Sequence, residues 1–153
     1  MFDSHYDLLT YIYMKHKENN LDFIKKHCQN IYRPGNVEGG ILNLFFMSEK
    51  EMENELNISP KELDVLTMLS TVDKIIKENN LLPIPSNFVY GIEGCDYIKY
   101  PKDLIPLYEL GVRSINPVWN EPNKYGSGHR SSQGLTTLGR ELIEVASSLR
   151  HFN

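Results

Sequence analysis

The chain has 153 residues, 41% of them hydrophobic and 24% charged, and its formal net charge is -4. These values are typical of a single globular domain, which we take as residues 1–153. An acidic chain without a basic tract is a poor match for nucleic acid or for an anionic membrane surface. We therefore expect neither as a partner.

Two further observations bear on the cellular compartment. Cys28 and Cys95 form no C-x-x-C motif, which argues against a disulfide framework or a zinc knuckle and favours a reducing environment. The N-terminus lacks the pattern of a signal peptide, and no run approaches the roughly 18 apolar residues of a membrane span. We therefore expect a cytoplasmic protein.

The N-terminal part of the chain predicts a strand, two helices and a second strand. The first strand is short and ends near His5 and Asp7. Apolar residues at helical spacing then predict two short helices between residues 8 and 31. Residues 39–46 form an apolar run that begins with two glycines, which is typical of a strand buried on both faces of a parallel sheet.

Two capping boxes mark helix starts in the middle of the chain. Ser48 is followed three residues later by Glu51, and Ser59 is followed by Glu62, with Pro60 at the first helical position. From the second box we expect the clearest helix of the chain, whose apolar stripe ends at residues 79–80.

The C-terminal part predicts two more strands, each followed by a helix. Residues 88–92 form an apolar strand that runs directly into Glu93. A short helix over 102–110 is closed by Gly111, and residues 112–117 form the fourth strand.

A long polar loop, 119–134, precedes a last helix that begins at Thr136 or Thr137. Strand and helix thus alternate four times, which indicates an α/β protein with a parallel sheet. Two architectures remain: a small doubly wound sheet, or the first half of a TIM-like (β/α)8 barrel, apparently truncated, whose complete form needs about 250 residues.

The placement of polar residues favours the half-barrel. A doubly wound nucleotide-binding domain would carry a glycine-rich turn after its first strand, and residues 4–7 are Ser-His-Tyr-Asp instead. His5 and Asp7 end the first strand, Glu93 ends the third, and the long loop follows the fourth. Barrel enzymes keep their chemistry at these carboxyl ends.

His5 and Asp7 are also a possible ligand pair. Residues i and i+2 of a strand project to the same side, so the imidazole and the carboxylate can face one ion. This combination suits zinc and similar divalent metals. A polar strand end, or a helix N-cap at Asp7, is the alternative for a pattern this short.

Six segments of the chain match the motifs of a known family in type and in order. They are residues 3–7, 39–40, 91–94, 107–113, 119–123 and 134–142. Together they cover the chain from end to end. In this order they resemble the membrane (renal-type) dipeptidase family of zinc peptidases.

The resemblance implies a two-zinc centre in which His5 and Asp7 bind one metal and Glu93 bridges both. A carboxylate that bridges two cations fixes a shared hydroxide for attack on the peptide bond of a dipeptide, so Glu93 is the expected catalytic residue. The glycines on either side of Glu93 allow a backbone to approach ions closely.

Three departures from the family bear on this expectation. In the family, two histidines that bind the second zinc, and the residues that contact the substrate carboxylate, come from strands further along the sequence. This chain ends before those strands, so we expect its second zinc site to be incomplete. Trp119 and Asn120 stand where many members have a substrate-contacting histidine; Trp119 either lines the substrate pocket or packs under the loop. Cys95 replaces a common glycine; a thiolate that approaches a metal is one alternative, and a small buried side chain is what we expect there.

Three hypotheses follow. The first is the N-terminal half of a zinc-dependent dipeptidase. The second is a catalytically inactive fragment or binding module, which would need a complementary C-terminal half or a second copy to cover its open strand edges. The third is a different metal hydrolase on the same barrel, because a fold does not determine a substrate.

Overall fold

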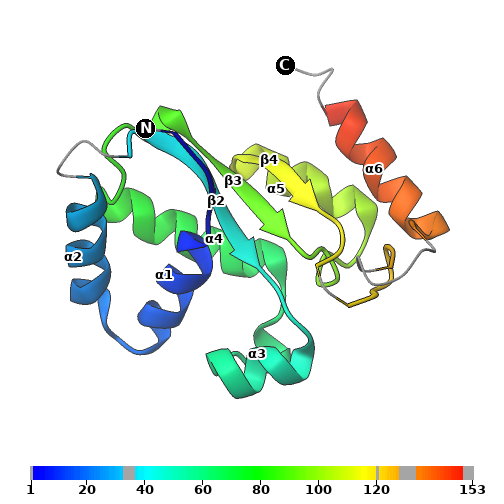
Figure 1. Cartoon of the computed structure of the whole chain (residues 1–153), viewed down its shortest axis with the longest axis horizontal. Helices are drawn as coiled ribbons and strands as arrows, with labels where there is room; N and C mark the ends of the chain where they lie inside the picture. The colour runs from blue at the N-terminus through cyan, green and yellow to red at the C-terminus, as the bar shows by residue number, and fades with distance from the viewer. Residues whose placement is uncertain (1, 33–36, 120, 128–133, 150–153) are drawn as a thin grey trace.

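The computed structural model describes residues 2–32, 37–119, 121–127 and 134–149 (Figure 1). Four strands in this part of the chain form one parallel sheet in the order β1-β2-β3-β4. Their bounds are β1 (Phe2–Tyr6), β2 (Gly39–Phe45), β3 (Phe88–Glu93) and β4 (Val112–Asn116). The predicted α/β class with a parallel sheet is confirmed.

Helices follow each strand and pack against one another in a row. The bounds are α1 (Leu8–Lys17), α2 (Leu21–Tyr32), α3 (Glu49–Leu56), α4 (Val65–Glu78), α5 (Leu104–Leu110) and α6 (Thr137–Leu149), with short 3-10 turns η1 (Pro60–Glu62), η2 (Pro85–Asn87) and η3 (Pro101–Asp103). Helix α1 contacts α4, α4 contacts α5, and α5 contacts α6. None of the described helices is long and apolar enough to cross a membrane.

The helix row covers one face of the sheet. Leu42 and Leu44 of β2 are buried on that side, and the Tyr90 hydroxyl of β3 donates a hydrogen bond to Asp73 of α4 at 2.6 Å. The alternate residues Ile41 and Phe45 are only partly buried. Asn43, which lies between them on the same face, is buried, so the expectation that β2 is buried on both faces is confirmed only in part.

The helix expected from Ser59 begins later than predicted. The capping box is present, but it closes only the turn η1, and the backbone leaves helical geometry at Leu63 (φ -76°, ψ 70°). Helix α4 starts afresh at Val65, where the Asp64 side chain accepts a hydrogen bond from the Thr67 N–H at 3.0 Å. The Ser59 capping box thus begins the turn η1, and Asp64 separately caps helix α4.

The loop after β4 is anchored to the last helix. Asn123 and Leu135 each form an isolated bridge to Gly126, and Tyr125 is fully buried. Gly139 of α6 lies so close to this loop that an added Cβ would stand 1.9 Å from the Tyr125 carbonyl oxygen. Helix α6 can therefore dock here only with glycine at this position.

Candidate metal centre

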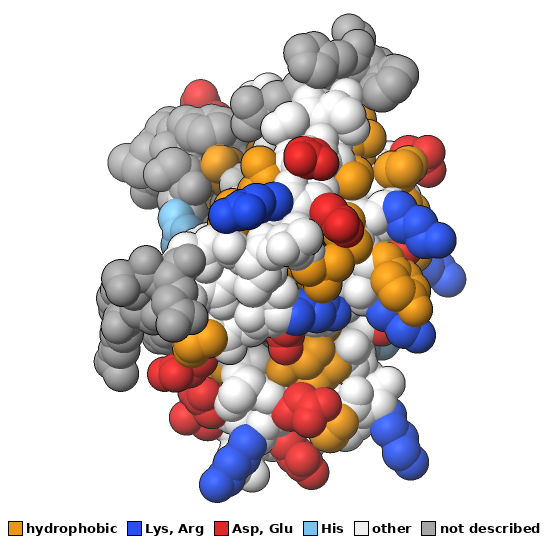
Figure 2. Space-filling view, turned by 90° about the vertical axis from the view of Figure 1, so that its right-hand side faces the viewer, with side chains coloured by type: hydrophobic (Ala, Val, Ile, Leu, Met, Phe, Trp, Pro, Cys, Tyr) orange, Lys and Arg blue, Asp and Glu red, His pale blue; other side chains and the backbone are white. Residues whose placement is uncertain are grey.

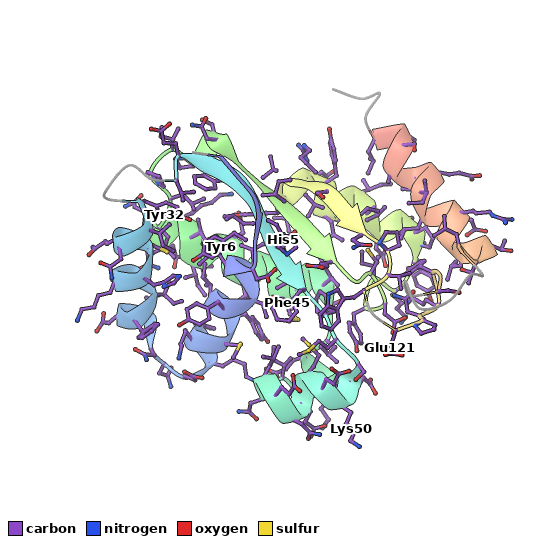
Figure 3. All side chains as sticks on the ribbon, viewed as in Figure 1. His5, Tyr6, Tyr32, Phe45, Lys50 and Glu121 are labelled. Carbon is purple, nitrogen blue, oxygen red and sulfur yellow. The ribbon has the colours of Figure 1, made fainter. Side chains whose placement is uncertain are left out.

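Three potential ligands meet at the carboxyl end of the sheet. His5 lies near the end of β1, Asp7 follows it at the N-cap of α1, and Glu93 is the last residue of β3. Nε2 of His5 is 3.3 Å from Oδ1 of Asp7 and 3.3 Å from Oε2 of Glu93. Figure 3 shows His5 near the arrowheads of β2 and β3. The structure thus brings together the three residues that the sequence singled out as ligands.

The Asp7 side chain makes no capping hydrogen bond, although Asp7 occupies the N-cap position of α1. The alternative role for this residue is therefore not realised, and its carboxylate is turned to His5. The side chains of His5 and Asp7 are 57% and 48% exposed, whereas that of Glu93 is 17% exposed. The trio is open to solvent on one side, which a site for an exchangeable substrate requires.

Burial raises the pKa of Glu93 above its ordinary value, and the charge of Asp7 adds to this effect. The charge of His5 and a hydrogen bond from Trp119 oppose it without cancelling it. Two carboxylates held this close repel each other, so a bound cation would favour the arrangement.

The donor set matches the chemistry of zinc. One ligand atom from each of His5, Asp7 and Glu93 lies within 4.8 Å of the others. An imidazole nitrogen with two carboxylate oxygens, open to solvent, is the kind of set that holds a catalytic zinc. Within the described ranges no second group of His, Cys, Asp and Glu converges in this way.

Asn43 is a residue of the site that sequence reasoning missed. Its amide nitrogen lies 3.2 Å from Nδ1 of His5, and the residue is only 5% exposed. With the amide turned so that Oδ1 accepts from Nδ1–H, Nε2 is the nitrogen that faces the carboxylates. The available signal was a single polar residue within the apolar run of β2.

Trp119 lies between Glu93 and a cavity next to the three potential ligands. It hydrogen-bonds to the Glu93 carboxylate, and its ring centroid is 6.4 Å from that of Phe45. It also lines a cavity of about 550 Å³. This geometry agrees with pocket lining, but its substrate role stays a prediction. Asn120 lies outside the described residues.

Cys95 is unsuited to the role of metal ligand. The side chain is fully buried, its sulfur is 3.5 Å from the Asn116 carbonyl oxygen, and burial raises the pKa of the thiol to about 12. A thiol with this pKa is protonated at neutral pH, and the thiolate is the form that binds metals. The prediction of a small buried side chain is confirmed.

Comparison with known proteins supplies relatives but no activity. No family model matches the chain. Over 107 residues it is 25% identical to an "Uncharacterized protein in PQQ-III 3'region" of Acinetobacter calcoaceticus, which covers 64% of this chain and 32% of that protein. Over 57 residues it is 40% identical to an "Uncharacterized protein in pqqA 5'region" of Klebsiella pneumoniae, which covers 32% of this chain and 21% of that protein. The chain thus matches about a third or less of either curated relative.

Proposed function

We propose that the chain is the N-terminal half of a zinc-dependent dipeptidase that resembles the membrane (renal-type) family and hydrolyses the peptide bond of dipeptides. The observation that carries the proposal is the convergence of His5, Asp7 and Glu93 from the ends of β1 and β3. These are the residues, and the roles, that the resemblance implies. Glu93 is the proposed catalytic residue.

Three features support a half-barrel as the scaffold. The strands lie in sequential order, the helices that follow them form one row, and the opposite face of the sheet is partly exposed. In a (β/α)8 barrel each helix lies outside its strand, and the opposite face lines the interior. A doubly wound sheet would instead reverse its strand order and carry helices on both faces.

The residues have distinct tasks in the proposed reaction. His5 and Asp7 would hold one zinc ion and Glu93 would bridge to a second, whose other ligands are not among the described residues. When bound, zinc supplies a Lewis acid and lowers the pKa of water. Asn43 orients His5, Trp119 holds the Glu93 carboxylate, and Trp119 and Asn120 would contact the dipeptide.

Zinc stoichiometry and dipeptide hydrolysis test the proposal together. We expect the purified chain to retain about one zinc ion after dialysis, because one ligand set is present. His5→Ala and Asp7→Asn should lose it, whereas His16→Ala, at an exposed position of α1, should not. Equal zinc content in all variants would contradict the metal site. Cleavage of an amide or a lactone in preference to dipeptides would favour a different metal hydrolase.

A second candidate function is that of a binding module completed by a partner chain. A cavity of about 620 Å³ lies between β4, α5 and α6, and the outer edge of β4 pairs with no other described strand. Figure 2 shows the α6 side of the molecule, where hydrophobic side chains are exposed among charged ones. A fifth parallel strand, from a complementary half or a second copy, would satisfy this edge.

The mass of the chain in solution tests this second candidate. Ile143 lines the cavity and is 36% exposed, whereas Ile105 is 46% exposed on α5 and does not line it. If copies pair through β4, Ile143→Glu should shift the equilibrium towards monomer, and Ile105→Glu should leave it unchanged. A monomer that binds zinc and cleaves dipeptides at every concentration would exclude this candidate.

A further inference from the structure

A cavity of about 550 Å³ opens beside the metal trio, at the same end of the sheet. It lies between the start of α3 and the loops that follow β3 and β4. Gly94, the neighbour of Glu93, and Trp119, which hydrogen-bonds to Glu93, both line it. The cavity therefore adjoins the trio through Gly94 and Trp119, although none of the three potential ligands lines it.

The walls of the cavity are held by specific contacts. Gly94 adopts a positive φ of 83°, and an added Cβ would come within 2.9 Å of the Phe46 carbonyl oxygen. The Tyr97 hydroxyl donates a hydrogen bond to the Met47 carbonyl at 2.9 Å, and the Ser48 hydroxyl caps α3. These contacts join the segment after β3 to the start of α3, so two of the cavity's walls are held together.

The lining combines negative charge with aromatic rings. The lining contains one lysine, Lys50, and four carboxylates, which belong to Glu49, Glu51, Asp96 and Glu121. Figure 3 shows Lys50 on α3 and Glu121 in the loop after β4. The rings of Phe46 and Tyr97 lie 5.2 Å apart, and Trp119 completes the aromatic wall.

The carboxylates act on one region of the cavity. Burial, followed by the charges of Asp96, Glu49 and Glu51, raises the pKa of Tyr97 to about 12. Three acids from two separate segments therefore exert their negative charge at one ring. An aromatic wall with surrounding carboxylates is the environment that guanidinium and ammonium groups prefer.

We propose that this cavity is the substrate pocket for the cationic side chain of an arginine or lysine residue in the dipeptide. The assignment rests on the proposed peptidase function, because the metal trio would hold the scissile bond while the pocket holds the side chain. Acidic side chains are repelled by the lining, and neutral ones forgo the charge complementarity. The substrate class is therefore a basic dipeptide.

Trp119 provides a direct readout, because it is the only tryptophan of the chain. The zinc-loaded full chain is titrated with arginyl-alanine, with citrullinyl-alanine as the neutral counterpart of the same shape, and with glutamyl-alanine. Tryptophan fluorescence follows binding, and product release follows hydrolysis. We expect arginyl-alanine to bind about tenfold or more tightly than citrullinyl-alanine, the scale of a charge-assisted contact.

Matched variants locate the effect in the cavity. Glu49→Gln and Asp96→Asn remove charges from the lining, and Glu53→Gln removes one from an exposed position of α3 outside it. The first two should each reduce the preference for arginine over citrulline several-fold, whereas Glu53→Gln should not. Unfolding curves of all three confirm that the fold is retained.

The possible results separate this inference from the proposed function. Equal binding of the arginine and citrulline peptides, or a preference that the cavity variants leave intact, overturns the pocket even if neutral dipeptides are cleaved. A preference for arginine that depends on Glu49 and Asp96 supports the pocket. If that preference appears while no dipeptide is hydrolysed, the cation pocket stands and the peptidase function fails.

Discussion

The side chain of Asn43 lies across Gly91, its direct partner in the pairing of β2 and β3. A Cβ at position 91 would stand 2.2 Å from Oδ1 of Asn43 and 3.0 Å from Cγ2 of Ile41. Glycine at this position therefore provides the space through which the amide reaches His5. The geometry of the candidate metal centre thus depends on a residue that has no side chain.

Gly91→Ala should disturb the site without touching a ligand. The new methyl group displaces Asn43, so we expect zinc affinity to fall about tenfold or more and the free energy of unfolding to fall by about 1–3 kcal/mol. Zinc titration against a chelator and urea unfolding measure the two effects. Val89→Ala, on the same face of β3, is the control: it should lower stability alone. Unchanged zinc affinity in Gly91→Ala would show that Asn43 does not position His5.

Replacement of Asn43 itself separates hydrogen bonding from packing. Asn43→Ala removes the partner of Nδ1, and we expect zinc affinity to fall about 10- to 100-fold. Asn43→Asp retains an acceptor for Nδ1–H, so its affinity should stay close to that of the unaltered chain. A loss of equal size in both variants would show that an acceptor for Nδ1–H is not what Asn43 contributes.

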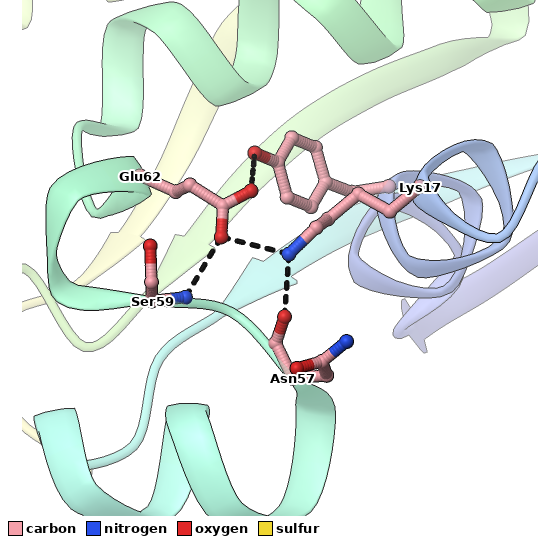
Figure 4. Close-up of polar contacts among 5 residues, drawn as sticks. Lys17, Asn57, Ser59 and Glu62 are labelled. Atoms are coloured by element: carbon pink, nitrogen blue, oxygen red, sulfur yellow. Dashed lines mark hydrogen bonds and ion pairs between the residues drawn. The ribbon is translucent and has the colours of Figure 1, made fainter.

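Glu62 links α1 to the segment before α4 (Figure 4). It accepts hydrogen bonds from Lys17 at 2.7 Å, from the Ser59 N–H at 2.7 Å and from the Tyr13 hydroxyl at 3.2 Å, and Lys17 also donates to the Asn57 carbonyl. Burial raises the pKa of Glu62, but these contacts outweigh it and hold the pKa below the ordinary value of 4.5.

A lowered folded-state pKa means that the unfolded chain binds the proton more readily. The stabilisation is therefore complete above the ordinary pKa and is lost as pH falls through the folded-state value. Glu62→Gln should reduce the free energy of unfolding by about 1–2 kcal/mol at pH 7, and the difference should shrink in acid. Glu78→Gln, in an exposed pair with Lys74 at 3.8 Å, should show almost no difference. A pH-independent deficit in Glu62→Gln would contradict the ionic origin.

Gly139→Ala tests the docking of α6. The added methyl would overlap the Tyr125 carbonyl, so we expect a loss of about 1–3 kcal/mol in the free energy of unfolding. Ser147→Ala, at an exposed position of the same helix, should be neutral or slightly stabilising because alanine favours helices. Thermal unfolding of both variants measures the difference. Equal melting temperatures would show that α6 shifts freely against the loop.

Local signals in the sequence predicted the elements well, and contacts between distant residues account for the errors. The glycine-led run 39–46 gave β2 to within one residue, and the stripe after Thr136 gave α6. The start of α4 was missed because Glu62, expected to complete the capping box of that helix, instead closes the turn η1 and binds Lys17 and Tyr13 of α1. Such pairings leave no local trace.

The candidate site could be predicted only in part, because some of its contacts also join residues that are distant in sequence. His5 and Glu93 stand far apart in sequence, yet parallel strands bring their carboxyl ends to one edge, so their proximity could be expected. The contact of Asn43 with His5 depends on strand register and on the space above Gly91. Neither is encoded in residues near Asn43.

The two buried cysteines allow local opening of the fold to be measured at two places. Cys28 is 3% exposed within α2, and Cys95 is fully buried at the end of β3, in a different part of the core. A thiol reagent reaches either sulfur only when the surrounding segment opens. The two labelling rates therefore report the opening of the α2 side and of the side that carries the candidate metal centre separately, without any engineered cysteine.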